Sequence, residues 1–476
     1  MGTLMIEHAN AMPAPTWHRL GVNDVDIELP DDLAFARQVE VQCAEGLLGD
    51  EGAFDAALLS MADPLPVAAA PSAAAGDLGE QPAMRAADQG LSPVEPASVP
   101  TSAAHQVDNP ASLSAAMESG GSAAHQVDEQ GILPAAMEDG TTAMEGEAAA
   151  LEEPALSFYQ QQALEARYLA PADVFATGMG DEAREYLEFA AGEPVVLVTR
   201  PGERTCATVR VEGVDGAVNA AAIDIVAAPG SSLALAIALD SPAPGAGVVG
   251  TRLRVFAGAD ARVDIVSTQT LDDSWTALDD AGIVLDERAR VQLRQTVLGA
   301  GRSYTGLDAD VRGDDARLDI DTRYLGHAAQ QRDFNYVAHQ RGRRTVCNLD
   351  ANGVLAGESE KTLRGTIDLV HGCKGSVGSE QETVLLADER VANRTVPVIL
   401  CDEDDVAGNH GATIGHVAPK QLFYLASRGI SPDDAERLFI AAAFEEAAIG
   451  APDERTRAAV ARLAAARGIA LEEAVA

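Results

Sequence analysis

The chain has 476 residues, 47% of them hydrophobic, and a formal net charge of −40 from 34 Lys and Arg against 74 Asp and Glu. This length accommodates two or more globular domains. Nucleic-acid phosphates and anionic membrane surfaces attract positively charged proteins, so this acidic chain is a poor partner for either. We therefore expect no nucleic acid and no membrane among its partners.

The cysteines and the N-terminus indicate a reducing compartment. The five cysteines are widely spaced and include no CxxC pair, whereas a disulfide framework would be dense and even. The first 14 residues contain neither the basic nor the apolar region of a signal peptide. The apolar runs are also far shorter than the roughly 20 residues that span a bilayer. The sequence predicts a cytoplasmic protein.

The N-terminal segment, residues 1–60, has patterns of ordered structure. Apolar and acidic residues alternate over 25–29, which predicts a short strand. After two aspartates, Phe35, Val39 and Leu47 have a spacing that predicts a helix.

Residues 61–155 have the composition of a disordered acidic linker rich in Ala and Pro. They include no Phe, Tyr, Trp or Lys, so they cannot bury enough apolar surface to offset the entropy of ordering. The heptapeptide that begins at Ser102 recurs 20 residues later at Ser122. His105 and His125, one in each copy, are either metal ligands or, in our interpretation, part of a duplication within a linker.

Residues 156–192 read as a helical region, and from 193 to 418 the apolar period changes to two. Short strands with alternating burial, separated by turn residues, predict a sandwich, a barrel or a β-helix, of which we favour a β-helix-like solenoid. The predicted strands cover residues 195–198, 207–211, 222–226, 233–239, 253–257, 263–266, 291–297, 304–311 and 318–324.

Residues 419–476 are expected to form a C-terminal helical domain that caps the β body. A short helix is predicted over 419–427. Ser431 is a predicted N-cap, and Gly450 is a predicted stop for the second helix. A third helix is predicted to begin near Pro452.

Two long motifs resemble those of the SufB/SufD family. They are Asp404-Asp-Val-Ala-Gly-Asn-His-Gly-Ala-Thr-Ile-Gly415 and Gln421-Leu-Phe-Tyr-Leu-Ala-Ser-Arg-Gly-Ile430. The resemblance covers about residues 156–450, and it is supported by further segments in the family's order. These are Gln331, Asp333 and His339, Gly353-Val-Leu355, Arg364-Gly-Thr-Ile367, Asn393-Arg-Thr-Val-Pro397 and, near the N-terminus, Thr16-Trp-His-Arg-Leu-Gly-Val-Asn23.

The resemblance implies a right-handed parallel β-helix between an N-terminal region and a C-terminal helical domain. It also implies a scaffold for iron–sulfur cluster assembly that is not itself an enzyme. In this family SufD pairs with SufB through the β-helices, and each binds a SufC ATPase through its C-terminal helices. No tightly bound cofactor is implied, only a transient cluster at the subunit interface. The chain has no P-loop motif, so the energy source would be the partner.

Two departures favour SufD over SufB. Val391 stands where SufB has its cluster-building cysteine, and Gly408-Asn-His-Gly-Ala-Thr413 replaces the Glu-His-Glu-Ala-Thr motif of SufB. Many SufD proteins have a cysteine at the position of Gly408, so any thiolate here would come from elsewhere.

The resemblance places cluster assembly and the subunit interface at His410, Asp404, Asp405, Gly411 and Thr413. His410 is the candidate iron ligand, because a neutral imidazole suits iron. The alternative is that the His-Gly-Ala-Thr run forms a tight corner packed at a dimer face. The run of acids at 402–405 either attracts iron or forms a solvated turn.

Cysteine offers two further candidates. Cys401 is either the missing thiolate or, more often for such a position, a buried small hydrophobic residue. The buried interpretation also applies to Cys347 and Cys373. His371 and Cys373 are two residues apart and would share one face of a strand, which is a weak signal for a metal site.

The predicted SufC-binding surface lies in the C-terminal helices. Its residues are Gln421, Phe423, Tyr424, Arg428, Gly429 and Phe444. Two other functions remain open. One is a self-sufficient SufB-like homodimer, and the other is a polysaccharide-acting β-helix enzyme, which the acidic composition disfavours.

Overall fold

We analysed a computed structural model of the chain, which describes residues 2–14, 21–49, 52 and 175–471. All of these residues belong to one compact unit. The predicted linker at 61–155 and the first part of the predicted helical region, 156–174, lie outside the described residues.

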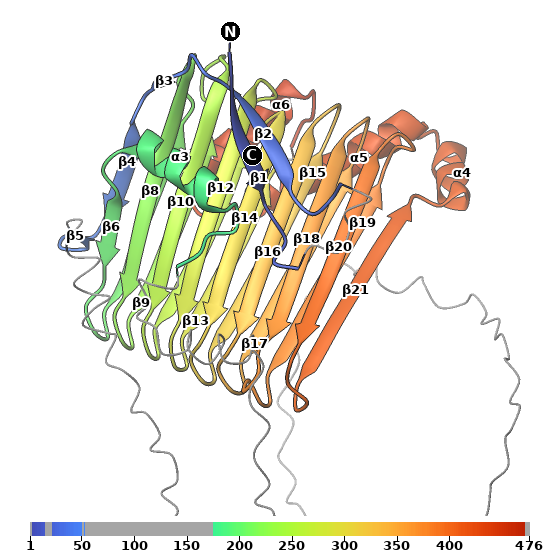
Figure 1. The fold of residues 1–476 in the computed structure, drawn as a ribbon. Helices are drawn as coiled ribbons and strands as arrows, with labels where there is room; N and C mark the ends of the chain where they lie inside the picture. The colour runs from blue at the N-terminus through green and yellow to red at the C-terminus, as the bar shows by residue number, and fades with distance from the viewer. Residues whose placement is uncertain (1, 15–20, 50–51, 53–174, 472–476) are drawn as a thin grey trace, which may run out of the picture. The chain divides into compact units, whose positions relative to one another are not determined.

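Two long sheets form the body of the protein (Figure 1). Successive strands alternate between the sheets, and from β6 onwards the pairs within each sheet are parallel, which defines a β-solenoid. One sheet has the order β20 (Ala392–Cys401), β18 (Glu360–Leu369), β16 (Gln331–Gln340), β14 (Arg302–Val311), β12 (Trp275–Leu285), β10 (Gly247–Ala257), β8 (Ala217–Ala227), β6 (Val195–Val198) and β5 (Leu48–Gly49), and its tenth strand, β3 (Ala34–Phe35), pairs with β8. The other has the order β21 (Ala407–His416), β19 (Val377–Leu386), β17 (Val346–Leu355), β15 (Arg317–Gly326), β13 (Arg290–Val297), β11 (Arg262–Thr270), β9 (Ser232–Asp240), β7 (Arg204–Glu212) and β4 (Val39–Cys43).

The predicted parallel β-helix is therefore confirmed, and every strand predicted over 195–324 lies within an observed one. The prediction missed β12, in which Asp280 is buried on one face and Asp279 is partly buried on the other. These acids interrupt the apolar alternation that marks a half-buried strand.

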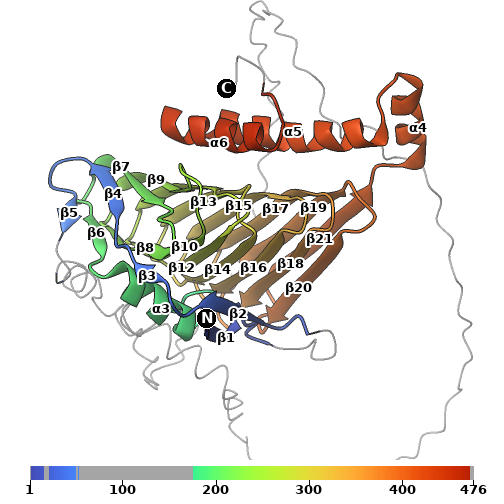
Figure 2. The same cartoon turned by 90° about the horizontal axis from the view of Figure 1, so that it is seen from above.

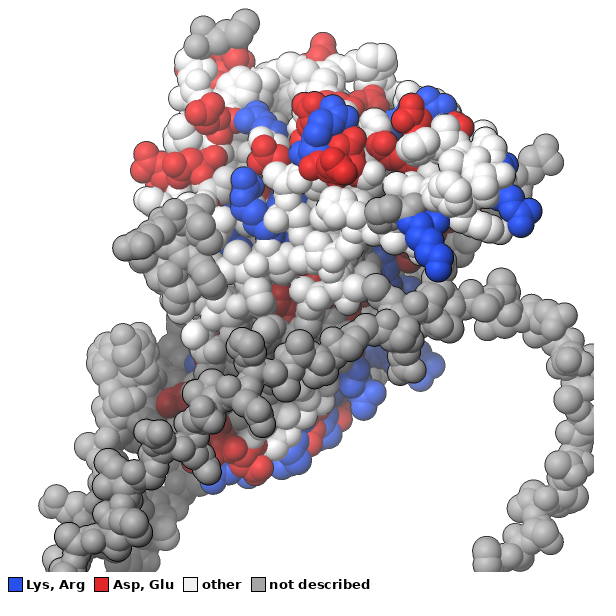
Figure 3. All heavy atoms as spheres, turned by 90° about the vertical axis from the view of Figure 1, so that its right-hand side faces the viewer, with Lys and Arg blue, Asp and Glu red and all other residues white. Residues whose placement is uncertain are grey.

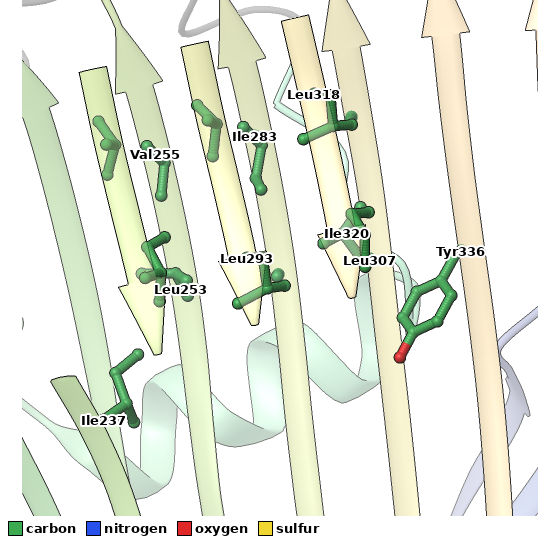
Figure 4. Close-up of a cluster of buried hydrophobic side chains, with 14 of the residues drawn as sticks. Ile237, Leu253, Val255, Ile283, Leu293, Leu307, Leu318, Ile320 and Tyr336 are labelled. Atoms are coloured by element: carbon green, nitrogen blue, oxygen red, sulfur yellow. The ribbon is translucent and has the colours of Figure 1, made fainter. Parts of the chain in front are cut away.

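Alternate side chains of both sheets meet in the lumen of the solenoid (Figure 4). Because neighbouring strands are parallel and in register, like side chains stack along the axis, as Val255 and Ile283 do. Each fully buried Val, Leu or Ile of this lumen stabilises the fold by roughly 1.5–3 kcal/mol. The lumen is thus the main core of the protein.

The N-terminal segment closes the first rung. The strand predicted over 25–29 is confirmed as β2 (Val25–Pro30), which pairs antiparallel with β1 (Thr3–Ala9). The helix predicted from Phe35, Val39 and Leu47 is wrong, because these residues lie in or beside β3 (Ala34–Phe35), β4 and β5. The edge strands β7 and β6 offer unpaired backbone groups, which β4 and β5 satisfy by antiparallel pairing.

The N-terminal strands and α3 (Asp181–Ala191) cover the outer face of the ten-stranded sheet, and the helix confirms the described part of the 156–192 prediction. A buried network fixes this cover. Arg364 donates to Val22 O at 2.5 Å and to Asp333 Oδ1 at 2.6 Å, and Asn10 Nδ2 donates to the same carboxylate at 2.7 Å.

The C-terminal helices are α4 (Pro419–Ser427), α5 (Pro432–Gly450) and α6 (Glu454–Ala466), as predicted. The Ser431 hydroxyl accepts from Asp434 N, which confirms the N-cap. These helices pack on the β body, as expected, but on its side and not on an end of the solenoid. They run back along the strand ends of the nine-stranded sheet (Figure 2), where Ile440 and Phe444 pack against Leu298 and Leu325.

The two ends of the solenoid therefore differ. β4 and β5 cover the first rung, but within the described part of the chain no strand pairs with the outer edge of β20 or β21. Among the described helices, none is both long and apolar enough to cross a membrane.

Candidate functional site

The open end of the solenoid presents a free strand edge on β21. Ala407 N donates to Ser376 O of the neighbouring strand at 3.0 Å. Because backbone groups alternate in direction along a strand, the N–H groups of Gly408, His410 and Ala412 point to the open edge. These groups can pair with an added strand.

The other edge strand at this end, β20, is blunted. Ala392 N donates to Ser359 O at 3.0 Å, so the backbone nitrogens that face the open edge are those of odd-numbered residues. Pro397 falls in this set, and its lack of an N–H breaks no bond with β18 while it interrupts pairing on the open side. The free edge of β21 is the better site for strand addition.

The charge at the open end differs from that of the whole chain. Neither β20 nor β21 contains an acidic residue, although the net charge is −40. Figure 3, which faces this end, shows uncharged side chains over much of its middle, with charged ones above and below. A second acidic protein could approach this end without strong repulsion.

His410 is exposed on β21 and lies on the lumen side of that strand. A β-carbon at Gly408 would contact Ile399 of the facing sheet, so position 408 faces the lumen, and position 410 shares its face. Gly411 and Thr413 lie on the opposite, outer side and are exposed. His410 therefore stands at the mouth of the lumen.

The acidic turn before β21 is organised by Glu403, which the sequence analysis did not single out. Its carboxylate accepts from Gly372 N at 3.0 Å and from Asp404 N at 3.1 Å. Burial raises the pKa of Glu403, but these backbone bonds outweigh it and lower the pKa overall. Asp404 and Asp405 are exposed in this turn and lie several residues from His410 along the chain.

Cys401 is exposed, so its interpretation as a buried residue is wrong. Its thiol donates to Glu403 O at 3.3 Å. Gly408 of β21 faces Ile399 of β20, and the chain reverses between these strands, so Cys401 lies at the level of residue 406. His410 is therefore four residues, or roughly 13 Å, away from Cys401 along the strand direction. The structure does not bring this thiol and this imidazole together.

Of the other two cysteine predictions, one is confirmed and one is wrong. Cys347 and Cys373 are buried as expected, and burial raises the pKa of Cys373 to about 12. The predicted strand that would carry His371 and Cys373 on one face is wrong, because both lie in the turn between β18 and β19. Within the described ranges, no three His, Cys, Asp or Glu side chains form a group that could hold a metal ion.

The sequence analysis missed a polar cluster in the lumen behind the open end. Lys361 is fully buried and pairs with Glu382, which also accepts from Tyr324 Oη at 2.9 Å and Thr395 Oγ1 at 2.5 Å. Burial lowers the pKa of Lys361. Burial, together with the nearby Glu382, raises the pKa of Glu380 to about 8. The only available sequence signal was the position of these polar residues. They stand at every second place of their strands, in step with apolar residues whose side chains face the lumen.

Several residues that carry the family resemblance have structural contacts. Asp333 and Arg364 anchor the N-terminal cover, as described above. His339 Nδ1 lies 2.7 Å from Asp368 Oδ2 on the outer face of the ten-stranded sheet. Val391 packs against the lumen core.

The helical residues predicted to bind a partner differ in exposure. Phe423 and Tyr424 are 77% and 57% exposed, and the Arg428 guanidinium lies 5.2 Å from the Tyr424 ring centroid. Gln421 Oε1 accepts from Ala418 N and so caps α4, and Gly429 (φ 84°) turns the chain after it. The prediction for Phe444 is wrong, because this α5 side chain is fully buried between the helix and the solenoid.

Fold and site together define a two-sheet β-solenoid protein with one covered end, one free strand edge and flanking helices. Residues 209–443, about half of the chain, match the family described as "SUF system FeS cluster assembly, SufBD core domain", so the solenoid and the start of the C-terminal helices carry the SufBD core domain.

Curated relatives agree with the family match. The iron–sulfur cluster assembly protein SufD of Bacillus subtilis is 26% identical over 187 residues, which are 39% of this chain and 43% of that protein. A SufBD family protein of Mycobacterium tuberculosis is 34% identical over 20% of this chain and 11% of its own length. SufD of Escherichia coli is 30% identical over 18% of this chain and 21% of its own. The matched regions thus span less than half of each relative.

Proposed function

We propose that this protein is a scaffold subunit for iron–sulfur cluster assembly that has no catalytic turnover of its own. It acts in the manner of SufD: it pairs with a SufB-like subunit through the open end of the solenoid and binds a SufC-like ATPase through its C-terminal helices. A cluster is assembled transiently at the shared interface, where His410 is the candidate ligand of this chain.

The free edge of β21 is the single observation that carries the proposal. Within the described part of the chain, the outer edge of β21 has unpaired N–H groups and neither of the last two strands carries an acid, and natural proteins avoid leaving such edges open to water alone. A partner strand would satisfy these groups and would bury His410 at the junction.

The pairing is tested with Ala412→Pro, which removes an N–H that points to the open edge and breaks no bond within the chain. The variant is co-expressed with a SufB-like and a SufC-like subunit, and co-purification is measured. We expect the SufB-like subunit to be lost while the SufC-like one is retained. Unchanged recovery of the SufB-like subunit would contradict pairing at this edge.

The ATPase surface is tested with point variants rather than by deletion of 419–476, because that deletion would also expose Leu298 and Leu325. Phe423→Ala with Tyr424→Ala removes two exposed rings and should abolish recovery of the SufC-like subunit. Phe189→Ala is the matched control, since Phe189 is 63% exposed on α3. Equal binding by all three proteins would refute the assignment.

The alternative is a SufB-like homodimer, which the same free edge would also support. Anaerobic reconstitution with iron and sulfide separates the two functions, with visible absorption as the readout. A stable cluster on the purified chain alone would favour the homodimer.

A further inference from the structure

Glu380 is a buried carboxyl group of the lumen that is only partly satisfied by its described neighbours. It is 3% exposed, and within the described residues its Oε2 atom has no hydrogen-bond partner. Its neighbour Glu382, two residues away on the same face, is satisfied by Lys361, Tyr324 and Thr395. Burial raises the pKa of Glu380 to about 8, so a proton neutralises this group when no cation is bound, and a cation that binds here takes the place of that proton.

The fold makes room for this carboxyl group instead of filling the space. A β-carbon at Gly365, on the facing sheet, would overlap Glu380 Oε1. A residue larger than glycine at 365 would therefore displace the carboxylate.

Glu380 and His410 are adjacent. They are Cα partners in the register of β19 and β21, so their side chains lie on the same, lumen-facing side of neighbouring strands. Directly paired residues have β-carbons about 5 Å apart, which lets a carboxylate and an imidazole reach one ion. Glu380 is buried and His410 is exposed, so the pair extends from the mouth of the lumen into its interior.

We propose that Glu380 and His410 form a two-ligand site for a divalent metal ion at the mouth of the lumen. A carboxylate oxygen and an imidazole nitrogen suit ferrous iron, and the choice of iron as the ion rests on the proposed function. Two protein ligands leave the remaining coordination positions to water, sulfide or a partner chain. Such a site holds an ion that is later passed on.

The test uses the full chain under anaerobic conditions with Fe²⁺ as the probe. Ascorbate and hydrogen peroxide then generate hydroxyl radicals at the bound iron, and mass spectrometry maps the backbone cleavage. We expect cuts in β19 and β21 near residues 380 and 410. Because loss of one supporting group typically weakens metal binding by about 10–100-fold, Glu380→Gln should shift the Fe²⁺ dependence of these cuts by at least tenfold.

Glu360→Gln is the matched control, because Glu360 is an exposed acid on the outer face of β18. It should leave the cleavage pattern unchanged, and thermal unfolding verifies that each variant is folded. Equal cleavage of wild type and Glu380→Gln, or cuts confined to the acidic turn at 402–405, would overturn the proposal. If these cuts are absent while the SufB-like subunit still co-purifies, only this inference fails and the proposed function stands.

Discussion

His339 offers a direct test of how charge stabilises the solenoid. Its side chain is 20% exposed on the outer face of the ten-stranded sheet, and its two ring nitrogens lie 2.7 Å from Asp368 Oδ2 and 3.5 Å from Asp308 Oδ2. Burial lowers the pKa of His339, but the two carboxylates outweigh burial and raise the pKa to about 10. The imidazole is therefore charged at neutral pH.

The sign of the pH dependence follows from this raised pKa. The stabilisation is fully present below pH 6.5, where both the folded and the unfolded chain hold the proton, and it is lost as the pH rises towards 10. The difference in pKa corresponds to at most roughly 5 kcal/mol, and structural relaxation reduces this value. We expect His339→Gln to destabilise the protein by about 2–4 kcal/mol at pH 6, since it leaves two partly buried acids without their cation.

Thermal and urea unfolding at pH 6, 8 and 10 provide the measurement. The difference in the free energy of unfolding between wild type and His339→Gln should narrow steadily as the pH rises. His410→Gln is the control, because His410 is exposed and should leave stability nearly unchanged at every pH. A difference in unfolding free energy that is constant with pH, or absent at pH 6, would refute the stabilising role of the charged imidazole.

Three further predictions concern buried and lumen-facing positions. Lys361→Met should cost about 3–5 kcal/mol in unfolding experiments, because it leaves Glu382 buried without its cation, and adding Glu382→Gln should restore most of the loss. Burial raises the pKa of Asp280 to about 7, so the wild type loses stability between about pH 4 and pH 7 as the unfolded chain ionises first. Asp280→Asn should therefore be close to wild type at pH 4.5 and more stable at pH 8, and the reverse order would contradict this assignment. Gly408→Cys places a thiol on the face of His410, with Ile399 and Leu369 shifting by a few tenths of an ångström, and should retain more iron and sulfide after anaerobic reconstitution. Gly415→Cys, on the other face of the same strand, should not.

The strand pattern was readable because the lumen is apolar and its side chains alternate. Runs such as those of β9 and β15 turn every second residue inward, and this period is a local property of the chain. The same holds for α5, whose N-cap Ser431 satisfies backbone groups within one turn. Local chemistry of this kind needs no knowledge of the rest of the fold.

The N-terminal strands and the burial of single residues were not readable in this way. Residues 39–43 form a strand because β7, far away in sequence, offers an open edge. Phe444 was expected to be exposed but is buried, because α5 folds back onto the solenoid. Cys401 was expected to be buried but is exposed, because β20 belongs to the open rung. In each case a distant element decides whether the side chain meets water.

The sequence alone determined the solenoid, the terminal helices and the family resemblance, because these depend on periodicity, capping and contiguous motifs. Only the tertiary structure placed Glu380 beside His410, blunted β20 with Pro397 and left the outer edge of β21 without a partner strand among the described residues. These features arise from register between strands about thirty residues apart, and register is set by the packing of the whole lumen.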